Sequence, residues 1–325
     1  MINPTTAQRR LLFGCFGLIL LGSFLVALTS ESSALSFSRV LATLIGKGSM
    51  MENFILWELR LPRILITLFA GMALALSGAL LQTVIKNDLA DPGIIGINAG
   101  AGAGIAVFFL SAPLAVASHS FLLPLAGCVG ACVTAALILF FSKNKTSAMI
   151  LNGIGFSFAM SGIMVVLMSA TQREKVDFLA SWLAGSIWGT SWLYTGILFV
   201  LCLVIIPFVL SKSHQLDLLR LSRETIIGLG IPLKKWRLVF IGCAVVLAGV
   251  SVSITGGISF IGLLGPHIAK ALVGVKHRHF LPMALLLGGT LLLIADSIAQ
   301  RLGIPAGIIV ALIGAPYFIY LLIKK

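Results

Sequence analysis

Apolar residues along this chain gather in long runs, and charged side chains fall mostly in the short connections between them. A helix needs about 20 mostly apolar residues to cross the hydrocarbon core of a bilayer, and several of these runs reach that length. The pattern therefore predicts an all-α membrane protein with about ten transmembrane helices. The predicted spans are 11–30, 62–84, 93–112, 121–141, 147–169, 191–211, 236–254, 258–274, 280–300 and 303–323.

The composition agrees with a chain that is surrounded by lipid. Hydrophobic residues make up 59% of the 325 positions and charged residues only 10%, whereas a soluble domain carries about 25% charged residues. The net charge of +13 would suggest nucleic acid as the partner of a soluble protein. In a membrane protein such an excess reports orientation instead, so we expect no nucleic-acid partner.

The positions of the lysines and arginines predict how the chain is oriented. If both termini lie in the cytoplasm, the alternating spans place most of these cations on the inside, as the positive-inside rule requires. The connection 212–235 is then the longest cytoplasmic one, and the segment 173–186 lies outside. The first apolar run follows Arg9 and Arg10 and is long for a signal peptide, so we expect it to be retained as a helix.

One pattern of small and apolar residues occurs twice. The pattern F-x-G-x-A-x-x-L-x-G occupies residues 69–78 in the second predicted span and residues 240–249 in the seventh, and residues 92–94 (PGI) have a looser echo at 266–268 (PHI). Copies that lie five spans apart run in opposite directions across the membrane. Inverted repeats are typical of transporters, whose pathway lies between the halves. Chance similarity in a sequence rich in Gly, Ala and Leu is the alternative.

The chain lacks the motifs that would let it power transport by itself. No G-x-x-x-x-G-K-[ST] phosphate loop is present, so ATP cannot bind by that route. Asp296 is the one acidic residue inside a predicted span, whereas ion-coupled carriers need ionisable groups within the membrane. We therefore expect a non-catalytic subunit that borrows energy from a partner. An ion-coupled secondary transporter and a passive channel are the alternatives.

Seven motifs together resemble one family, the permease subunits of ATP-binding-cassette importers for iron–siderophore complexes, haem and vitamin B12. The resemblance covers essentially the whole chain. The motifs are RLPR at 60–63, SGALLQ at 77–82, NDLADPGIIG at 87–96, WLAGS at 182–186, FIGLLGPHI at 260–268, AD at 295–296 and GAPYF at 314–318.

This resemblance implies a permease of a bacterial inner membrane that works as a dimer with a second copy or a paralogue. Two ATPase subunits, which use ATP and Mg²⁺, would dock on the inside, and a solute-binding protein would dock on the outside. The permease itself would hold no cofactor. The implied cargo is an iron(III)–siderophore complex, with haem or cobalamin as alternatives.

The resemblance also implies residues for docking the binding protein. Arg60 and Arg63 match the arginines that grip acidic residues on its two lobes, and the guanidinium fork suits that role. A third family arginine falls on Gln300, and Arg301 is the expected substitute. The alternative for Arg60 and Arg63 is that they anchor the end of a helix at the membrane surface.

The connection 212–235 resembles the pair of short coupling helices that sit in a cleft of the ATPase. Leucines alternate with charges there, as suits a short amphipathic helix at a protein surface. Ser222 and Ile226 depart from the family pattern, and a solvated basic loop is the alternative. The expected coupling residues are Leu218, Leu219, Leu221, Arg223, Glu224 and Gly230.

The remaining motif residues are expected to form the pathway or its packing. A lone histidine in an apolar span, such as His267, is more often a structural residue than a metal ligand, and no metal site is expected. These residues are Ser77, Gly78, Gln82, Asn87, Pro92, Gly96, Pro266, His267 and Asp296.

Overall fold

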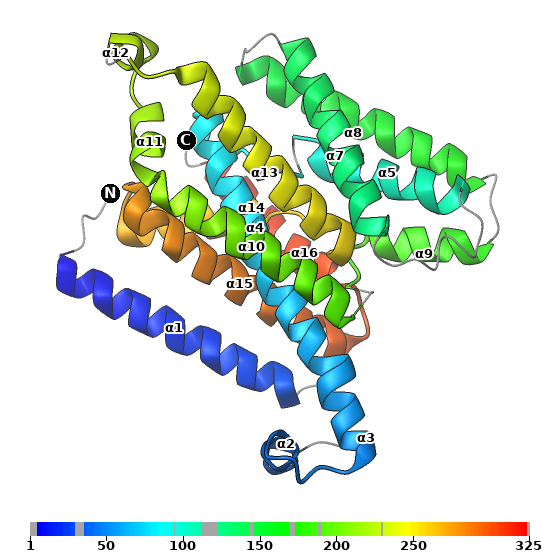
Figure 1. Cartoon of the computed structure of the whole chain (residues 1–325). Coiled ribbons are helices and arrows are strands. Elements are labelled where there is room, and N and C mark those ends of the chain that lie inside the picture. Colours follow the sequence, from blue (N-terminus) through cyan, green and yellow to red (C-terminus); the bar gives the residue numbers. More distant parts are fainter. Residues whose placement is uncertain are drawn as a thin grey trace.

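A computed structural model of the chain describes residues 5–29, 36–93, 95–111, 122–142, 146–169, 173–187, 190–228 and 230–323. Within these residues every regular element is a helix, which confirms the predicted all-α class (Figure 1). The elements are α1 (Thr6–Thr29), α2 (Phe37–Leu44), α3 (Met50–Asn53), the π-helical η1 (Phe54–Arg60), α4 (Leu61–Ile85), α5 (Ile97–Ser111), α7 (Leu122–Ser142), α8 (Thr146–Ser169), α9 (Arg173–Leu183), α10 (Trp192–Ser211), α11 (Ser213–Leu219), α12 (Arg223–Gly228), α13 (Leu233–Thr255), α14 (Ile261–Val273), α15 (His277–Leu302) and α16 (Ala306–Ile323).

Each of the predicted spans coincides with one helix, but two of these helices are short. Eight helices in the described part of the chain are long and apolar enough to cross a membrane. The other two, α5 with 15 residues and α14 with 13, measure roughly 22 and 20 Å at 1.5 Å per residue. A bilayer core is about 30 Å thick, so α14, and α5 as far as the described residues reach, are shorter than that core.

The internal repeat explains why the short helices are these two. Helices α4 and α13, which carry the two copies of the repeated pattern, lie side by side and run in opposite directions (Figure 1). The short helices α5 and α14 directly follow them. An inverted repeat therefore places one short helix after the first helix of each half. The looser echo does not extend this match, because Pro92 precedes α5 whereas Pro266 lies inside α14.

The first helix of each half packs into the other half. Helix α4 packs on α14 and α15 of the second half, and α13 packs on α5 and α7 of the first half. A hydrogen bond from the Ser77 hydroxyl to the Ala244 carbonyl, 2.7 Å long, links α4 to α13. The centre of the protein is therefore built from crossed halves, and α4 and α13 are its most buried long helices along with α15.

Glycine lets these helices approach closely, as is usual in lipid. A Cβ atom on Gly78 of α4 would lie 1.9 Å from the Gly262 carbonyl oxygen of α14, and one on Gly71 would lie 2.4 Å from the Gly288 carbonyl oxygen of α15. In the second copy of the pattern, a Cβ atom on Gly249 would lie 2.8 Å from the side chain of Ala131 in α7. Three of the four repeated glycines are thus contact points between the halves, and Gly242 is the exception.

The polar elements gather at two opposite ends of the helix bundle. The start of α1, α11 and α12 lie at one end, and α2 and α3 lie at the other (Figure 1). This arrangement agrees with an alternating course that puts the start of α1 and the connection 212–235 on the same side of the membrane. We call the end with α11 and α12 the inner end and the end with α2 and α3 the outer end.

Candidate functional site

At the outer end, Arg60 and Arg63 are tied to other helices of the same chain. Arg60 ends η1, is only 2% exposed, and donates a hydrogen bond to the Leu28 carbonyl of α1. Arg63 in the first turn of α4 donates to Asp296 of α15 through Nε (3.2 Å to Oδ2) and Nη2 (3.0 Å to Oδ1). Both arginines therefore anchor the outer end of α4, the alternative that the sequence left open for them.

Gln300, which stands where the family has its third arginine, belongs to the same cluster as Arg63 and Asp296. Gln300 donates from Nε2 to Asp296 Oδ2 over 2.6 Å, so it helps to hold the carboxylate that Arg63 also binds. Arg301 is exposed and lines a pocket of about 220 Å³ between α15 and α1. Docking of a binding protein by Arg60, Arg63 and Arg301 stays a prediction, and burial leaves Arg60 the least accessible of the three.

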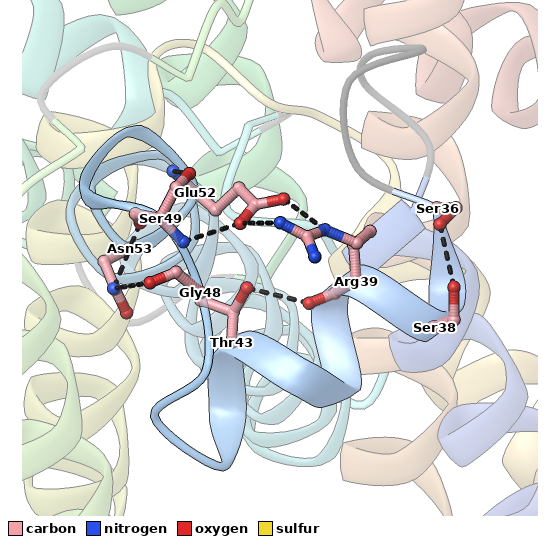
Figure 2. A network of polar contacts seen from close by, with 8 residues as sticks. All are labelled: Ser36, Ser38, Arg39, Thr43, Gly48, Ser49, Glu52 and Asn53. Carbon is pink, nitrogen blue, oxygen red and sulfur yellow. Dashed lines mark hydrogen bonds and ion pairs between the residues drawn. The ribbon is translucent and has the colours of Figure 1, made fainter.

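The outer turn formed by α2 and α3 carries a polar network that the sequence did not reveal (Figure 2). Arg39 pairs with Glu52 through two hydrogen bonds of 2.6 and 2.7 Å, and Glu52 also accepts from the Ser49 amide at the start of α3. Glu52 raises the pKa of the Arg39 guanidinium through this pair. The Ser49-x-x-Glu52 spacing is a capping box and was the available signal for this turn.

In the middle of the bundle, the predicted pathway residues hold the helices together. Ser77 and Gly78 lie at the contacts of α4 with α13 and α14. After α4, Asn87 accepts a hydrogen bond from the Leu89 amide, and the turn that follows leads through Pro92 to Gly96, whose φ of +89° is a conformation that favours glycine. The structure gives these residues a packing and turn-forming role, and a role in solute passage stays a prediction.

Pro266 and His267 lie on α14, and Pro266 is buried. The half-buried His267 ring meets the Tyr317 ring of α16 edge-on, with 5.7 Å between centroids. Among the described residues, no group of three His, Cys, Asp or Glu side chains could hold a metal ion. The ring contact of His267 joins α14 to α16.

At the inner end, a cluster of polar residues joins α4, α14 and α15. Lys270 of α14 donates to Gln82 Oε1 (2.8 Å) and to Asp88 Oδ1 (2.6 Å). The Gln82 amide in turn donates to the Gly262 carbonyl over 3.2 Å. Gln82, Asp88 and Lys270 line a pocket of about 210 Å³. Its other lining residues are Thr83, Lys86, Arg220 and His277. Of this cluster, the sequence singled out only Gln82 as a candidate.

The same cluster fixes α11, the first helix of the connection 212–235, to the transmembrane bundle. Asp217 of α11 accepts from the backbone amide of His277 (3.1 Å) and lies 2.6 Å from its Nδ1, while the His277 Nε2 lies 2.8 Å from the Thr83 hydroxyl of α4. Arg220 donates to the Val275 carbonyl over 2.7 Å, and Lys86 donates to the Leu221 carbonyl. A displacement of α11 would thus act directly on the inner ends of α4 and α15.

The predicted coupling residues divide into buried and exposed ones. Leu219 is buried, Leu218 is half-buried, and Leu221 and Glu224 are exposed. Gly230 adopts a φ of +70° in the turn before α13, which explains glycine at this position. Arg223 begins α12, and its side chain lies outside the described atoms. Contact with an ATPase stays a prediction for all six residues.

Replacing Asp217 by alanine is expected to loosen α11 and α12 without unfolding the bundle. The change removes the acceptor of two His277 donors, and hydrogen bonds to a charged group contribute about 1.5–3 kcal/mol each. Hydrogen exchange over residues 213–228, followed by mass spectrometry, should become on the order of tenfold faster or more. His214→Ala is the matched control, because His214 is exposed on the same helix. Unchanged exchange in the Asp217 variant would refute the anchoring role.

The sequence of this chain is similar to those of known transport proteins. Residues 19–324 match the FecCD transport family. The chain is 35% identical over 321 residues to the iron-uptake system permease protein FeuC of Bacillus subtilis, with 95% of each chain covered. It is 37% identical over 331 residues to the Fe(3+)-citrate import system permease protein YfmE of the same organism, with 99% of this chain and 98% of the relative covered.

A solved structure extends the comparison to three dimensions. The chain superposes with a TM-score of 0.83 and 30% identity on an inward-facing transporter described as being of the metal-chelate ABC type, over 98% of this chain and 100% of the other. Sequence and fold therefore agree over nearly the full length. The chain is an integral membrane permease subunit of the ABC importer class and belongs to the FecCD transport family.

Proposed function

We propose that this chain is the inner-membrane permease through which an iron(III)–siderophore complex enters the cytoplasm. Two ATPase subunits supply the energy at the inner end, and a solute-binding protein delivers the cargo at the outer end. The permease forms a dimer with a second copy or a paralogue. The iron-uptake and iron-citrate permeases to which it is similar support this assignment of cargo.

The link between α11 and the bundle is the observation that carries the mechanism. An ATPase that closes on ATP would push on α11 and α12, and the Asp217–His277 and Arg220–Val275 bonds would pass the movement to α15. Lys86 and Thr83 would pass it to α4. Because α4 packs on α14 and α15 of the other half, a shift of its inner end alters the contact between halves.

The outer end supports delivery by a separate protein. Arg63 keeps a 25% exposed side chain while it holds Asp296, and Arg301 is exposed five residues after Asp296 on α15. Both cations would meet carboxylates of a binding protein on the proposed docking face. The ion-coupled alternative requires a carboxylate that can change its protonation in the membrane. Asp296, the acid that the sequence offered for it, already accepts from Arg63 and Gln300.

Transport by the assembled complex in proteoliposomes would test the proposal. We expect uptake of a radiolabelled ferric siderophore that requires ATP, the ATPase and the binding protein, and that survives collapse of ion gradients by an ionophore. Uptake by the permease alone, or loss of uptake with the ionophore while ATP is present, would overturn it. Parallel uptake measurements with haem and cobalamin test the cargo separately. Uptake of either one in place of the ferric complex would support the assignment to the importer class and contradict the proposed substrate.

A further inference from the structure

The inner end of α13 borders a second pocket, which shares only Lys86 with the pocket of the inner polar cluster. Its volume is about 520 Å³, and it lies among the ends of α4, α7 and α13 and the coupling helices α11 and α12. We call it the Lys234 pocket. Its lining residues are Val84, Lys86, Leu139, Phe140, Leu219, Ile226, Leu233, Lys234, Arg237, Leu238 and Ile241.

The lining of the Lys234 pocket is divided into a cationic part and an apolar part. Lys234, Arg237, Leu238 and Ile241 follow the spacing that places residues on one face of a helix. The cations come first along α13, and the apolar side chains lie deeper toward the membrane. Lys86 adds a third positive charge from the end of α4, and none of the lining residues that the structure describes is acidic.

The apolar part of the pocket is open to the surroundings of the helix bundle. Phe140 at the inner end of α7 is 77% exposed, and Leu238 is 61% exposed. In a membrane such side chains face acyl chains. Trp236 lies between Lys234 and Arg237 along α13, and Lys212 Nζ is 5.9 Å from the centre of its ring. Tryptophan and lysine together are typical of the level of the lipid headgroups.

We propose that the Lys234 pocket binds an anionic phospholipid of the inner leaflet, with the phosphate group near Lys234, Arg237 and Lys86 and an acyl chain along Leu139, Phe140 and Leu238. Charge complementarity and the open apolar wall favour a lipid over free phosphate, because a phosphate ion has no apolar part that could contact this wall. Basic pockets between transmembrane helices on the cytoplasmic side are known to hold such headgroups.

The position of the pocket also favours a lipid over a segment of a partner ATPase. Leu219 and Ile226 from the coupling helices are both buried where they line the pocket. The pocket therefore lies between the coupling helices and the transmembrane helices rather than on the surface that α11 and α12 present to a partner.

Native mass spectrometry of the full-length detergent-purified protein with added lipid tests this proposal. We expect phosphatidylglycerol to remain bound in preference to phosphatidylcholine, and the double variant Lys234→Gln/Arg237→Gln to bind it roughly thirtyfold more weakly, since each cation near the surface contributes about 1 kcal/mol. The matched control is Lys235→Gln/Arg278→Gln, which removes two exposed cations at the same end of the bundle but outside the pocket. This control should bind as the wild type does.

A second measurement on the unmutated protein keeps the proposal testable if the double variant does not fold. Brominated phosphatidylglycerol should quench the fluorescence of Trp236 more strongly than brominated phosphatidylcholine, with Trp236→Phe defining the signal. Equal binding of both lipids, or equal loss in both double variants, would overturn a specific site. Displacement of the lipid by millimolar inorganic phosphate would indicate a simple anion site instead. If the double variant kept its lipid but lost an added ATPase, the pocket would be a protein-docking site and the proposal would fail.

Discussion

Replacing Gly78 by leucine is expected to prevent the chain from reaching a folded, monodisperse state. The new Cβ would lie 1.9 Å from the Gly262 carbonyl oxygen, and this oxygen belongs to the backbone of α14, which cannot rotate aside as a side chain can. Overpacking of a core usually costs about 1–3 kcal/mol, and a clash of a Cβ atom with a backbone that cannot move aside should exceed that range. Size-exclusion chromatography after solubilisation, followed by a thermal melt, measures the effect.

The internal repeat supplies a matched pair of controls for this experiment. Gly71 and Gly242 occupy the same place in the two copies of the pattern, but only at Gly71 would a Cβ atom meet a backbone, 2.4 Å from the Gly288 carbonyl oxygen. No heavy atom lies within 4 Å of a Cβ on Gly242. We expect Gly71→Leu to fail as Gly78→Leu does and Gly242→Leu to melt close to the wild type. A monodisperse Gly78→Leu protein with an unchanged melting temperature would refute the close contact of α4 with α14.

Replacing Asp296 by leucine is expected to destabilise the outer end of the bundle, because Arg63 is left without its carboxylate. Removal of one partner from a buried ion pair costs about 3–5 kcal/mol, and partial exposure of Arg63, at 25%, places this change at the lower end. The double variant Arg63→Met/Asp296→Leu should recover most of the loss, since apolar replacements of both partners are often neutral. Thermal melts of the two single variants and the double variant measure the coupling.

The same double variant separates anchoring from docking. It restores a folded outer end but lacks the Arg63 cation, so transport in proteoliposomes should fall strongly if Arg63 also grips the binding protein. Wild-type uptake by the folded double variant would show that Arg63 only anchors α4. The single variants cannot decide this point, because they disturb the fold and the proposed docking face together.

The sequence predicted the helices well because long apolar runs are placed in lipid, where the backbone must satisfy its own hydrogen bonds as a helix. It did not reveal that α5 and α14 are short, since an apolar run does not show where the backbone turns within it. Gly96 with a φ of +89°, Gly256 with +79° and Phe260 with +68° place turns next to these two helices. The described residues 93, 95 and 96 before α5 and 258–260 before α14 are not helical, so both predicted spans begin earlier than the helices do.

The motifs located the candidate site but not its contacts. The RLPR motif marked Arg60 and Arg63, yet their partners Leu28 and Asp296 lie 32 and 233 positions away in the sequence. The inner cluster was largely missed for the same reason. No local sequence pattern marks Lys270, Asp217 or His277. Asp217 and His277 meet only because α11 packs against α15.

The crossed packing of the halves has a consequence for biosynthesis. Helix α4 leaves the ribosome long before α14 and α15, which cover its glycine face. Until those partners are made, the nascent α4 must wait in the bilayer with that face against lipid or another protein. Neither half expressed as a separate polypeptide should be stable, and simultaneous expression of both, split between α10 and α13, should rescue the two fragments together.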